Sequence, residues 1–306
     1  MSSETAVNRQ TNTKSSAKWK KLKSFFKMYK LETFMILPLI VYMFYFTLTP
    51  IINTVTMSFK DDDTGAWTLG NYQEIFTNIN FTSALFNTLF ITIVGIVLQI
   101  GFALIIALLL NQEFKGKGFF RTLMLVPMGV PTLVSGVTLL FIFGQTGYFN
   151  ELLFRLGVVD TQPFWLGGGI DTLFVIIFAD MWKVLPLTVL LLLAGLQSIS
   201  KDVYEASSID GASSWQTFWS ITLPLLKPSI TMAVILRAID SFRIFELPLV
   251  MAGKSAPVLS TFSYEAFRHS NYGISGAAAT ILLGIIVLFI IAYLFIVERK
   301  NLKEVK

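Results

Sequence analysis

Six long apolar stretches restrict what this chain can fold into more than any other feature of the sequence. They lie near residues 34–58, 84–110, 120–143, 173–197, 227–250 and 276–297. Each is long enough to cross the roughly 30 Å of hydrocarbon in a bilayer as a helix. Charged residues make up only 14% of the chain, against about 25% in soluble domains. The sequence therefore predicts an all-α integral membrane protein with six transmembrane helices.

The distribution of lysine and arginine predicts the orientation of these helices. With the N-terminus inside, the inside segments hold 17 of the 24 Lys and Arg residues, and the outside loops hold four. Positive charge is retained on the cytoplasmic side of a membrane. We therefore expect cytoplasmic tails at 1–31 and 299–306, flanking a transmembrane domain at 32–298. The run Asp61, Asp62 and Asp63 falls outside, and we interpret it as a solvated loop rather than a metal site.

The N-terminal tail carries a basic amphipathic segment, AKWKKLKSFFKMYK, before the first span. On a helix, its apolar side chains gather on one side (Trp19, Leu22, Phe25, Phe26 and Tyr29) and its lysines lie largely opposite. A helix lying on an anionic inner leaflet is one interpretation, and a solvated basic tail is the other. Because the positive charge lies mostly on one side of the membrane, nucleic acid is a poor partner. The lack of cysteine and the single histidine, His269, argue against cysteine or histidine metal sites.

Two kinds of interruption in the spans are typical of transporters. Pro127 and Pro131 in VPMGVPTLVSG predict a kinked or unwound third span. Ionisable residues in the fourth and fifth spans are spaced by three and share helix faces: Asp180 and Lys183, then Arg237, Asp240, Arg243 and Glu246. Such groups are costly in a membrane unless they are paired or hydrated. A salt-bridge network that locks the helices is one interpretation, and a polar lining to a substrate path is the other.

The segment between the fourth and fifth spans, at 200–224, has the most specific pattern. It reads KDVYEASSIDGASSWQTFWSITLPLLKP from Lys201, which predicts a short polar helix, a sharp turn at Gly211 and a second, amphipathic helix. Pro224 and Pro228 then direct the chain into the membrane. By the orientation above, this helical hairpin is exposed to the cytoplasm and suits a docking surface.

These residues resemble the EAA loop of membrane subunits of binding-protein-dependent ABC importers. Glutamate to glycine spans six residues and glycine to isoleucine ten, and the motif residues are Glu205, Ala206, Gly211, Ile221, Leu223 and Pro224. Ser207 stands where the family usually has a second alanine. Further similarity lies in MWKVLP, LLAGLQSI, LPLLKP, FRTLMLVP and Gly70-Asn71-Tyr72. Together these cover residues 35–297 and resemble the carbohydrate-uptake branch, specifically the first of two unlike membrane subunits related to maltose and glycerol-3-phosphate permeases. After the fifth span that branch often has a Gly-Gly-Pro stretch, whereas this chain reads MAGKSAPVLST.

The resemblance implies the type I ABC importer permease fold in the cytoplasmic membrane of a prokaryote. It implies four kinds of partner: a second homologous permease subunit, two ATPase subunits, an extracytoplasmic sugar-binding protein and the lipid bilayer. The chain has no GxxxxGK[ST] loop, so we expect no cofactor on it, with ATP and Mg held by the ATPase subunits and no enzyme activity of its own. The residues implied for ATPase coupling are Glu205, Ala206, Ser207, Asp210 and Gly211.

A sugar, specifically a di- or oligosaccharide, is the substrate class that the resemblance implies. Hydroxyl-rich solutes need hydrogen-bonding groups and aromatic faces. The candidate pathway residues are Asp180, Trp182, Lys183, Arg237, Asp240, Ser241, Phe242, Arg243 and Glu246. Two alternatives are an ion-coupled secondary transporter of a small polar solute and a membrane-embedded enzyme. The sequence shows no convincing inverted repeat for the first, and Asp180 with Lys183 is a thin constellation for the second.

Overall fold

The computed structural model describes residues 28–304, and side chains as far as residue 297. The secondary structure of the described part consists of helices joined by loops, with an isolated β-bridge between Lys60 and Trp67. Most of the predicted amphipathic segment around Trp19 lies outside the described residues. Six helical stretches are long and apolar enough to cross a membrane: Lys30–Ser58, Ile79–Asn111, Thr132–Arg155, Ile170–Gln197, Ser214–Phe242 and Tyr272–Val297. The predicted all-α membrane fold with six spans is confirmed. The chain divides between residues 56 and 57 into two compact units.

The first unit is one apolar helical run in which proline changes the local helix type. α2 (Lys30–Met43) continues through a π-helical turn (Phe44–Leu48) into α3 (Thr49–Ser58). Pro50 is the second residue after this turn, and a proline ring clashes with the carbonyl four residues before it in a regular α-helix. A second π-helical turn, Phe218–Thr222, stands in the same relation to Pro224. The wider turn removes this clash without ending the helix.

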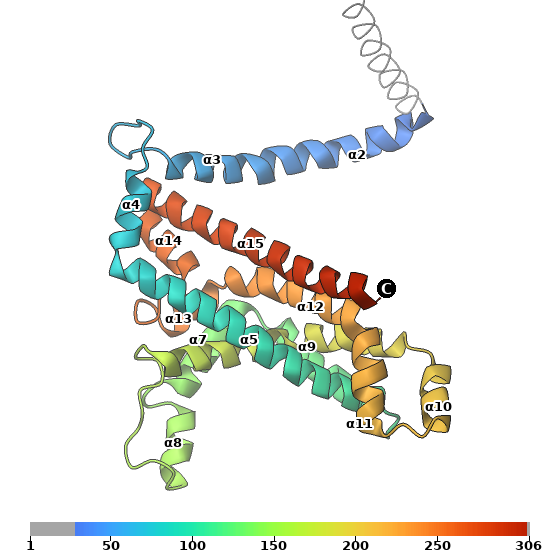
Figure 1. Cartoon of the computed structure of the whole chain (residues 1–306). Coiled ribbons are helices and arrows are strands. Elements are labelled where there is room, and N and C mark those ends of the chain that lie inside the picture. The colour runs from blue at the N-terminus through green and yellow to red at the C-terminus, as the bar shows by residue number, and fades with distance from the viewer. Residues whose placement is uncertain (1–27, 305–306) are drawn as a thin grey trace, which may run out of the picture. The chain divides into compact units, whose positions relative to one another are not determined.

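The second unit is built around α5 (Ile79–Asn111), which contributes to all three clusters of buried apolar side chains. Around it lie α4 (Gly70–Thr77), α7 (Thr132–Phe143), α9 (Ile170–Gln197), α12 (Leu223–Phe242), α13 (Glu246–Met251), α14 (Leu259–Arg268) and α15 (Tyr272–Glu304) (Figure 1). Small residues allow close helix contacts: a Cβ added at Gly195 on α9 would collide with Ser229 on α12.

The third and fifth spans end or break at prolines. The third, predicted at 120–143, is divided into α6 (Lys117–Leu125), a 3₁₀ turn (Val126–Gly129) and α7, as Pro127 and Pro131 predict. α8 (Tyr148–Arg155) follows it. The fifth span, predicted at 227–250, instead ends at Phe242. In a continuous helix the ring of Pro248 would clash with the carbonyl of Ile244, four residues before it. The Ile244 oxygen instead accepts a hydrogen bond from Ser260 Oγ.

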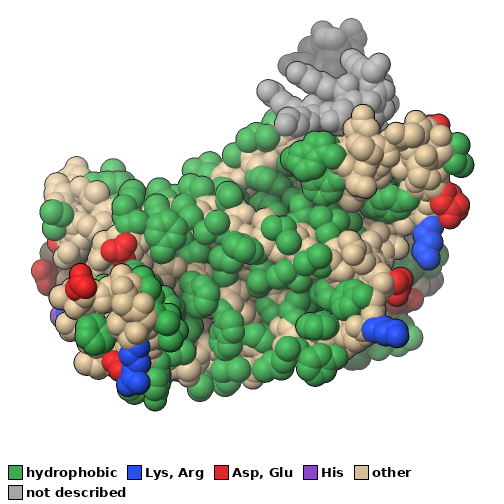
Figure 2. All heavy atoms as spheres, turned by 90° about the horizontal axis from the view of Figure 1, so that it is seen from below, with side chains coloured by type: hydrophobic (Ala, Val, Ile, Leu, Met, Phe, Trp, Pro, Cys, Tyr) green, Lys and Arg blue, Asp and Glu red, His purple; other side chains and the backbone are tan. Residues whose placement is uncertain are grey.

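Charged and apolar side chains separate along the second unit. On the face drawn in Figure 2, apolar side chains cover the middle, while Lys, Arg, Asp and Glu side chains lie toward the two ends. Figure 1 places α4, α13 and α14 at one of these ends, and α10 (Lys201–Ile209) and α11 (Ser214–Thr217) at the other. An apolar band between charged ends is the surface that a bilayer requires.

The acidic run after the first span forms a loop in which Asp62 and Asp63 are exposed, in agreement with its interpretation as a solvated loop, and two of its carboxylates also make defined contacts. Asp61 Oδ1 accepts hydrogen bonds from the Thr64 hydroxyl and amide, and these lower the pKa of Asp61. The two Asp62 carboxylate oxygens accept hydrogen bonds from the Gly273 amide, at 2.9 and 3.0 Å. Gly273 lies in the first turn of α15, where free amides and the helix dipole favour an anion. Asp62 therefore fastens this loop to the start of the last span.

Candidate functional site

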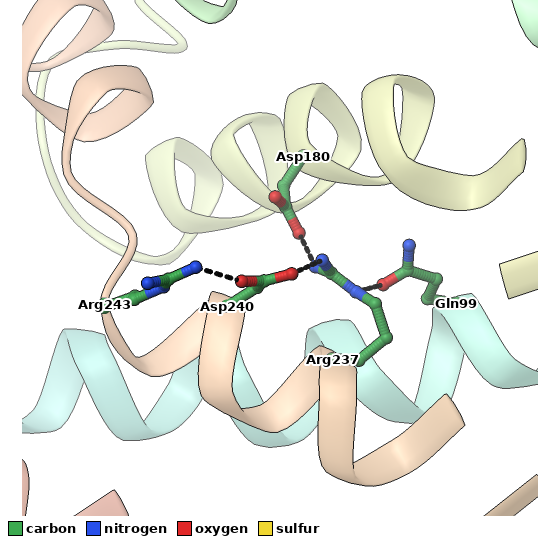
Figure 3. A network of polar contacts seen from close by, with 5 residues as sticks. All are labelled: Gln99, Asp180, Arg237, Asp240 and Arg243. Carbon is green, nitrogen blue, oxygen red and sulfur yellow. Dashed lines mark hydrogen bonds and ion pairs between the residues drawn. The ribbon is translucent and has the colours of Figure 1, made fainter. Parts of the chain in front are cut away.

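The charged residues of the fourth and fifth spans meet, as the interpretation of these residues as a salt-bridge network requires. Arg237 on α12 donates from Nη2 to Asp180 Oδ2 on α9 at 2.5 Å (Figure 3). Its Nε donates to Gln99 Oε1 on α5, also at 2.5 Å, and its Nη1 lies 3.8 Å from Asp240 Oδ2. The Arg237 side chain is 4% exposed. One guanidinium thus joins three membrane-spanning helices.

Gln99 is a member of this network that the sequence analysis did not select. It is 1% exposed, and its Nε2 has no hydrogen-bond partner among the residues that the structure describes. The available signal was the amide of Gln99 in the run from Ile93 to Leu110, which is otherwise apolar. Other polar residues of the same span act similarly: Asn87 Nδ2 donates to the Pro257 carbonyl, and Thr88 Oγ1 accepts from the Leu259 amide. Polar groups in this span therefore fasten α5 to other segments.

The predicted ridge of alternating charges does not continue beyond α12. Arg243 caps the end of this helix, and Glu246 begins α13, so the four residues do not lie along one helix. Arg243 Nη2 still donates to Asp240 Oδ1 at 2.7 Å. The chain of contacts therefore runs from Asp180 through Arg237 and Asp240 to Arg243 (Figure 3).

Exposure is low at the Asp180–Arg237 end of that chain of contacts and high at the Asp240–Arg243 end. The side chain of Asp180 is 17% exposed, Asp240 44% and Arg243 67%. Glu246 is exposed as well. A charged group at a protein surface within a span requires water or a protein neighbour, since hydrocarbon solvates it poorly. The network therefore has a buried part that joins helices and an open part that can meet solvent, solute or another subunit.

Two candidate pathway residues of α12 face the core. Ser241 is 2% exposed and Phe242 is 1% exposed. The ring of Phe242 lies 5.3 Å from that of Phe289 on α15 in an edge-to-face arrangement. The expectation that this ring covers a sugar face is therefore corrected, because helix packing occupies it.

Lys183 and Trp182 lie beside the broken third span. Lys183 Nζ donates at 2.6 Å to the carbonyl of Val130, which precedes Pro131 in the break. The lysine thus satisfies a carbonyl that the proline break leaves without a helical partner. Trp182 is 39% exposed and lines a largely apolar cavity of about 520 Å³ with Phe143 and Phe178.

The segment at 200–224 forms the predicted hairpin of two helices. Ser200 caps α10, and the Ser213–Gln216 capping box begins α11. Gly211 between them has φ +77°, in the left-handed region that favours glycine. The helical run from α11 into α12 then changes direction near its π-helical turn (Figure 1).

The motif residues divide between the two sides of α10. Ser207 is buried, donates to the Tyr204 carbonyl and lies 3.5 Å from Thr217 Oγ1. The departure from alanine thus falls at a position that packs against α11 and needs a small side chain. Glu205, Ala206, Asp210 and Gly211 are exposed. Large apolar side chains are exposed beside them: Ile209 at 84%, Trp215 at 71% and Trp219 at 50%. An exposed patch of this kind is typical of a protein contact.

Comparison with known sequences assigns most of this architecture to one family. Residues 99–300 match the family described as the binding-protein-dependent transport system inner membrane component. The matched range contains Gln99, the whole charged network and the hairpin at 200–224. It leaves out residues 301–306 and residues 1–98, which include the first span, α4 and residues 79–98 of the second span.

Individual relatives extend the similarity over most of the chain. The trehalose/maltose transport system permease protein of Thermococcus litoralis is 37% identical over 275 residues, which cover 87% of this chain and 92% of that protein. The multiple sugar-binding transport system permease protein of Streptococcus mutans is 35% identical over 270 residues, 83% and 90% of the two chains. A crystal structure of a bacterial alginate ABC transporter, in complex with an alginate pentasaccharide-bound periplasmic protein, contains a chain with TM-score 0.79 and 23% identity, covering 89% and 96%. That structural likeness supports the fold.

Proposed function

Because this chain belongs to the family of binding-protein-dependent transport system inner membrane components, we propose that it is the permease subunit of an ATP-driven sugar importer. Sugar as the substrate class is supported by the relatives, whose names specify trehalose, maltose and multiple sugars. The family membership favours ATP-driven import over an ion-coupled carrier, and the observation that carries the proposal is the 37% identity over nearly the whole chain.

The proposed complex consists of this chain, a second homologous permease subunit, two ATPase subunits and an extracytoplasmic sugar-binding protein. ATP and Mg bind the ATPase subunits, which hydrolyse the nucleotide. The membrane is the cytoplasmic membrane of a prokaryote, with both termini on the cytoplasmic side. The charge asymmetry between inside and outside segments supports this orientation.

The hairpin at 200–224 is the proposed contact with an ATPase subunit. The exposed Glu205 meets a basic group of the ATPase, and the apolar side chains beside it enter a groove. Gly211 allows the turn that presents α10, while Ser207 keeps α10 close to α11. Movement of the ATPase pair is then transmitted to α9 and α12, which flank the hairpin, and access to the pathway alternates.

The proposed substrate path follows the open part of the charged network. Asp240, Arg243 and Glu246 offer hydrogen-bonding groups to a sugar, and Trp182 offers an aromatic face. Asp180 and Arg237 hold α9 against α12, and the hydrogen bond from Arg237 to Gln99 joins α5 to them. Lys183 holds the broken third span through Val130. The two alternative interpretations of the charges thus apply to different parts of one network.

Uptake by the purified complex in proteoliposomes tests this function. We expect labelled trehalose or maltose to accumulate with internal ATP and external binding protein, and to do so equally after ionophores abolish ion gradients. Glu205→Lys should abolish uptake, since it reverses charge at the ATPase contact. Glu113→Lys changes an exposed acidic residue in another loop assigned to the same side and serves as the control. Uptake that requires an ion gradient and no ATP contradicts the proposal.

A further inference from the structure

A half-open pocket of about 340 Å³ lies at the end of the second unit that carries α4, α13 and α14. The charge asymmetry assigns this end to the outside. Its walls come from α4, the start of α5, α13 and the segment after it, α14 and the start of α15. The pocket is separate in its lining from the charged network of Arg237 and from the hairpin at 200–224.

The charged residues that line this pocket make it acidic overall. Glu74 and Glu265 line it with one cation, Lys254. Lys254 Nζ lies 3.8 Å from Glu265 Oε2, and the lysine side chain is 81% exposed. A long, exposed pair of this kind holds its partners weakly, so an incoming cation can displace Lys254. His269 is also part of the lining; its Nδ1 lies 2.7 Å from the main-chain oxygen of Glu265 and 3.9 Å from Glu265 Oε2.

The remaining walls suit a long aliphatic stem. Leu249, Phe262 and Ile274 provide apolar surface, and Asn271 provides an amide oxygen, whereas the Asn78 oxygen already accepts from the Asn80 amide. Lysine and arginine are the side chains that combine an aliphatic stem with a cationic head that binds carboxylates. The pocket therefore matches a basic side chain in charge and in the distribution of apolar surface.

Large apolar side chains are exposed next to lining residues of the pocket in the sequence. Phe76 and Ile79, on either side of the lining residue Asn78 in the sequence, are 63% and 80% exposed. Large apolar side chains around a polar recess are typical of a surface that another protein covers.

We propose that this pocket receives a lysine or arginine side chain of the sugar-binding protein when that protein docks. The inference rests on the proposed function, because it takes the binding protein as the partner on the outside. Glu74 and Glu265 bind the incoming cation, Lys254 moves away from Glu265, and Phe76 and Ile79 contact the surface around the inserted side chain.

The test measures binding of the purified binding protein to the complete importer in nanodiscs. Glu74→Gln/Glu265→Gln is expected to raise the Kd about tenfold, since each substitution removes a charge and keeps the side-chain shape. Lys254→Met is expected to lower the Kd a few-fold, because it removes the internal competitor. Glu151→Gln is the matched control; this acidic residue on α8 forms an i,i+4 pair with Arg155 outside the pocket, and it should leave the Kd unchanged.

The partner is identified by a photo-crosslinking residue at Asn80, which lines the pocket and is exposed. An adduct with the binding protein at a peptide containing lysine or arginine supports the proposal. An adduct with the second permease subunit overturns it, as does an unchanged Kd for the double variant while the wild type binds and transports. Wild-type uptake that needs no binding protein would instead contradict the proposed function.

Discussion

The contact between Arg237 and Asp180 allows a quantitative test of our division of the charged network. In that division the buried part holds helices together and the open part lines the substrate path. Arg237→Met removes the guanidinium and leaves Asp180 and Gln99 without their shared partner. Arg237 is 4% exposed and Asp180 17%, so water replaces the lost contact poorly. Removing one partner of a buried ion pair costs about 3–5 kcal/mol. We expect that loss in the free energy of unfolding of Arg237→Met.

Asp180→Asn should cost less. It retains an oxygen near Arg237 Nη2 and removes only the charge, and Asp240 remains 3.8 Å from Nη1. A hydrogen bond to a charged group contributes about 1.5–3 kcal/mol, which sets the expected loss. The double variant Asp180→Asn/Arg237→Met should be more stable than Arg237→Met alone, because it contains no unpaired charge at position 180.

The assay is reversible unfolding of the complex in detergent micelles, followed by uptake in proteoliposomes. If Asp180 and Arg237 only hold helices together, the double variant recovers both stability and uptake. Recovery of stability without uptake would place these residues in the substrate path. A loss below about 1 kcal/mol for Arg237→Met would refute the reasoning, because it would mean that the observed contacts contribute little to folding.

Three further results are expected. In this cysteine-free chain, a cysteine at Ser270 should react with an impermeant reagent from outside and one at Ser213 only after permeabilisation; the reverse pattern would refute the predicted orientation. Gly211→Val should abolish uptake, because φ +77° costs a non-glycine residue about 1–2 kcal/mol, whereas Gly211→Asn should retain more; equal uptake by the two would exclude backbone strain as the cause. Asp62→Ala should lower the free energy of unfolding by about 1 kcal/mol, because it removes the hydrogen bonds from the Gly273 amide at the start of α15. Asp63→Ala should have little effect. Equal losses for the two variants would contradict the inference that Asp62 fastens the loop to α15.

Most of the fold was predictable because lipid imposes a simple rule on sequence. A span needs about 20 apolar residues, so the length of each stretch indicated its existence. Local chemistry predicted more: Gly211 adopts the expected left-handed conformation, and Pro127 and Pro131 break the third span. The end of the fifth span was also indicated by Pro248, although the apolar pattern continues past it. At this position the proline indicated the end of the span better than the apolar composition did.

The geometry of the site was only partly predictable, because spacing identifies a helix face but not what that face meets. A spacing of three placed Asp180 with Lys183, yet the first contacts Arg237 and the second contacts Val130. Phe242 follows two pathway candidates in the sequence, but its ring packs on Phe289. Gln99 carried a weak signal, since one amide in an apolar helix indicates a polar contact without naming the partner.

The uneven exposure of the network bears on how this chain sits in its complex. Asp240 and Arg243 are paired and lie at an open surface, with side chains 44% and 67% exposed. On α15, by contrast, the exposed side chains include Leu288, Ile291 and Phe295. Lipid can cover those apolar groups but solvates the charged pair poorly. The face that carries Asp240 and Arg243 therefore requires a second subunit or an aqueous cavity beside it, and the second permease subunit that we propose as a partner provides both.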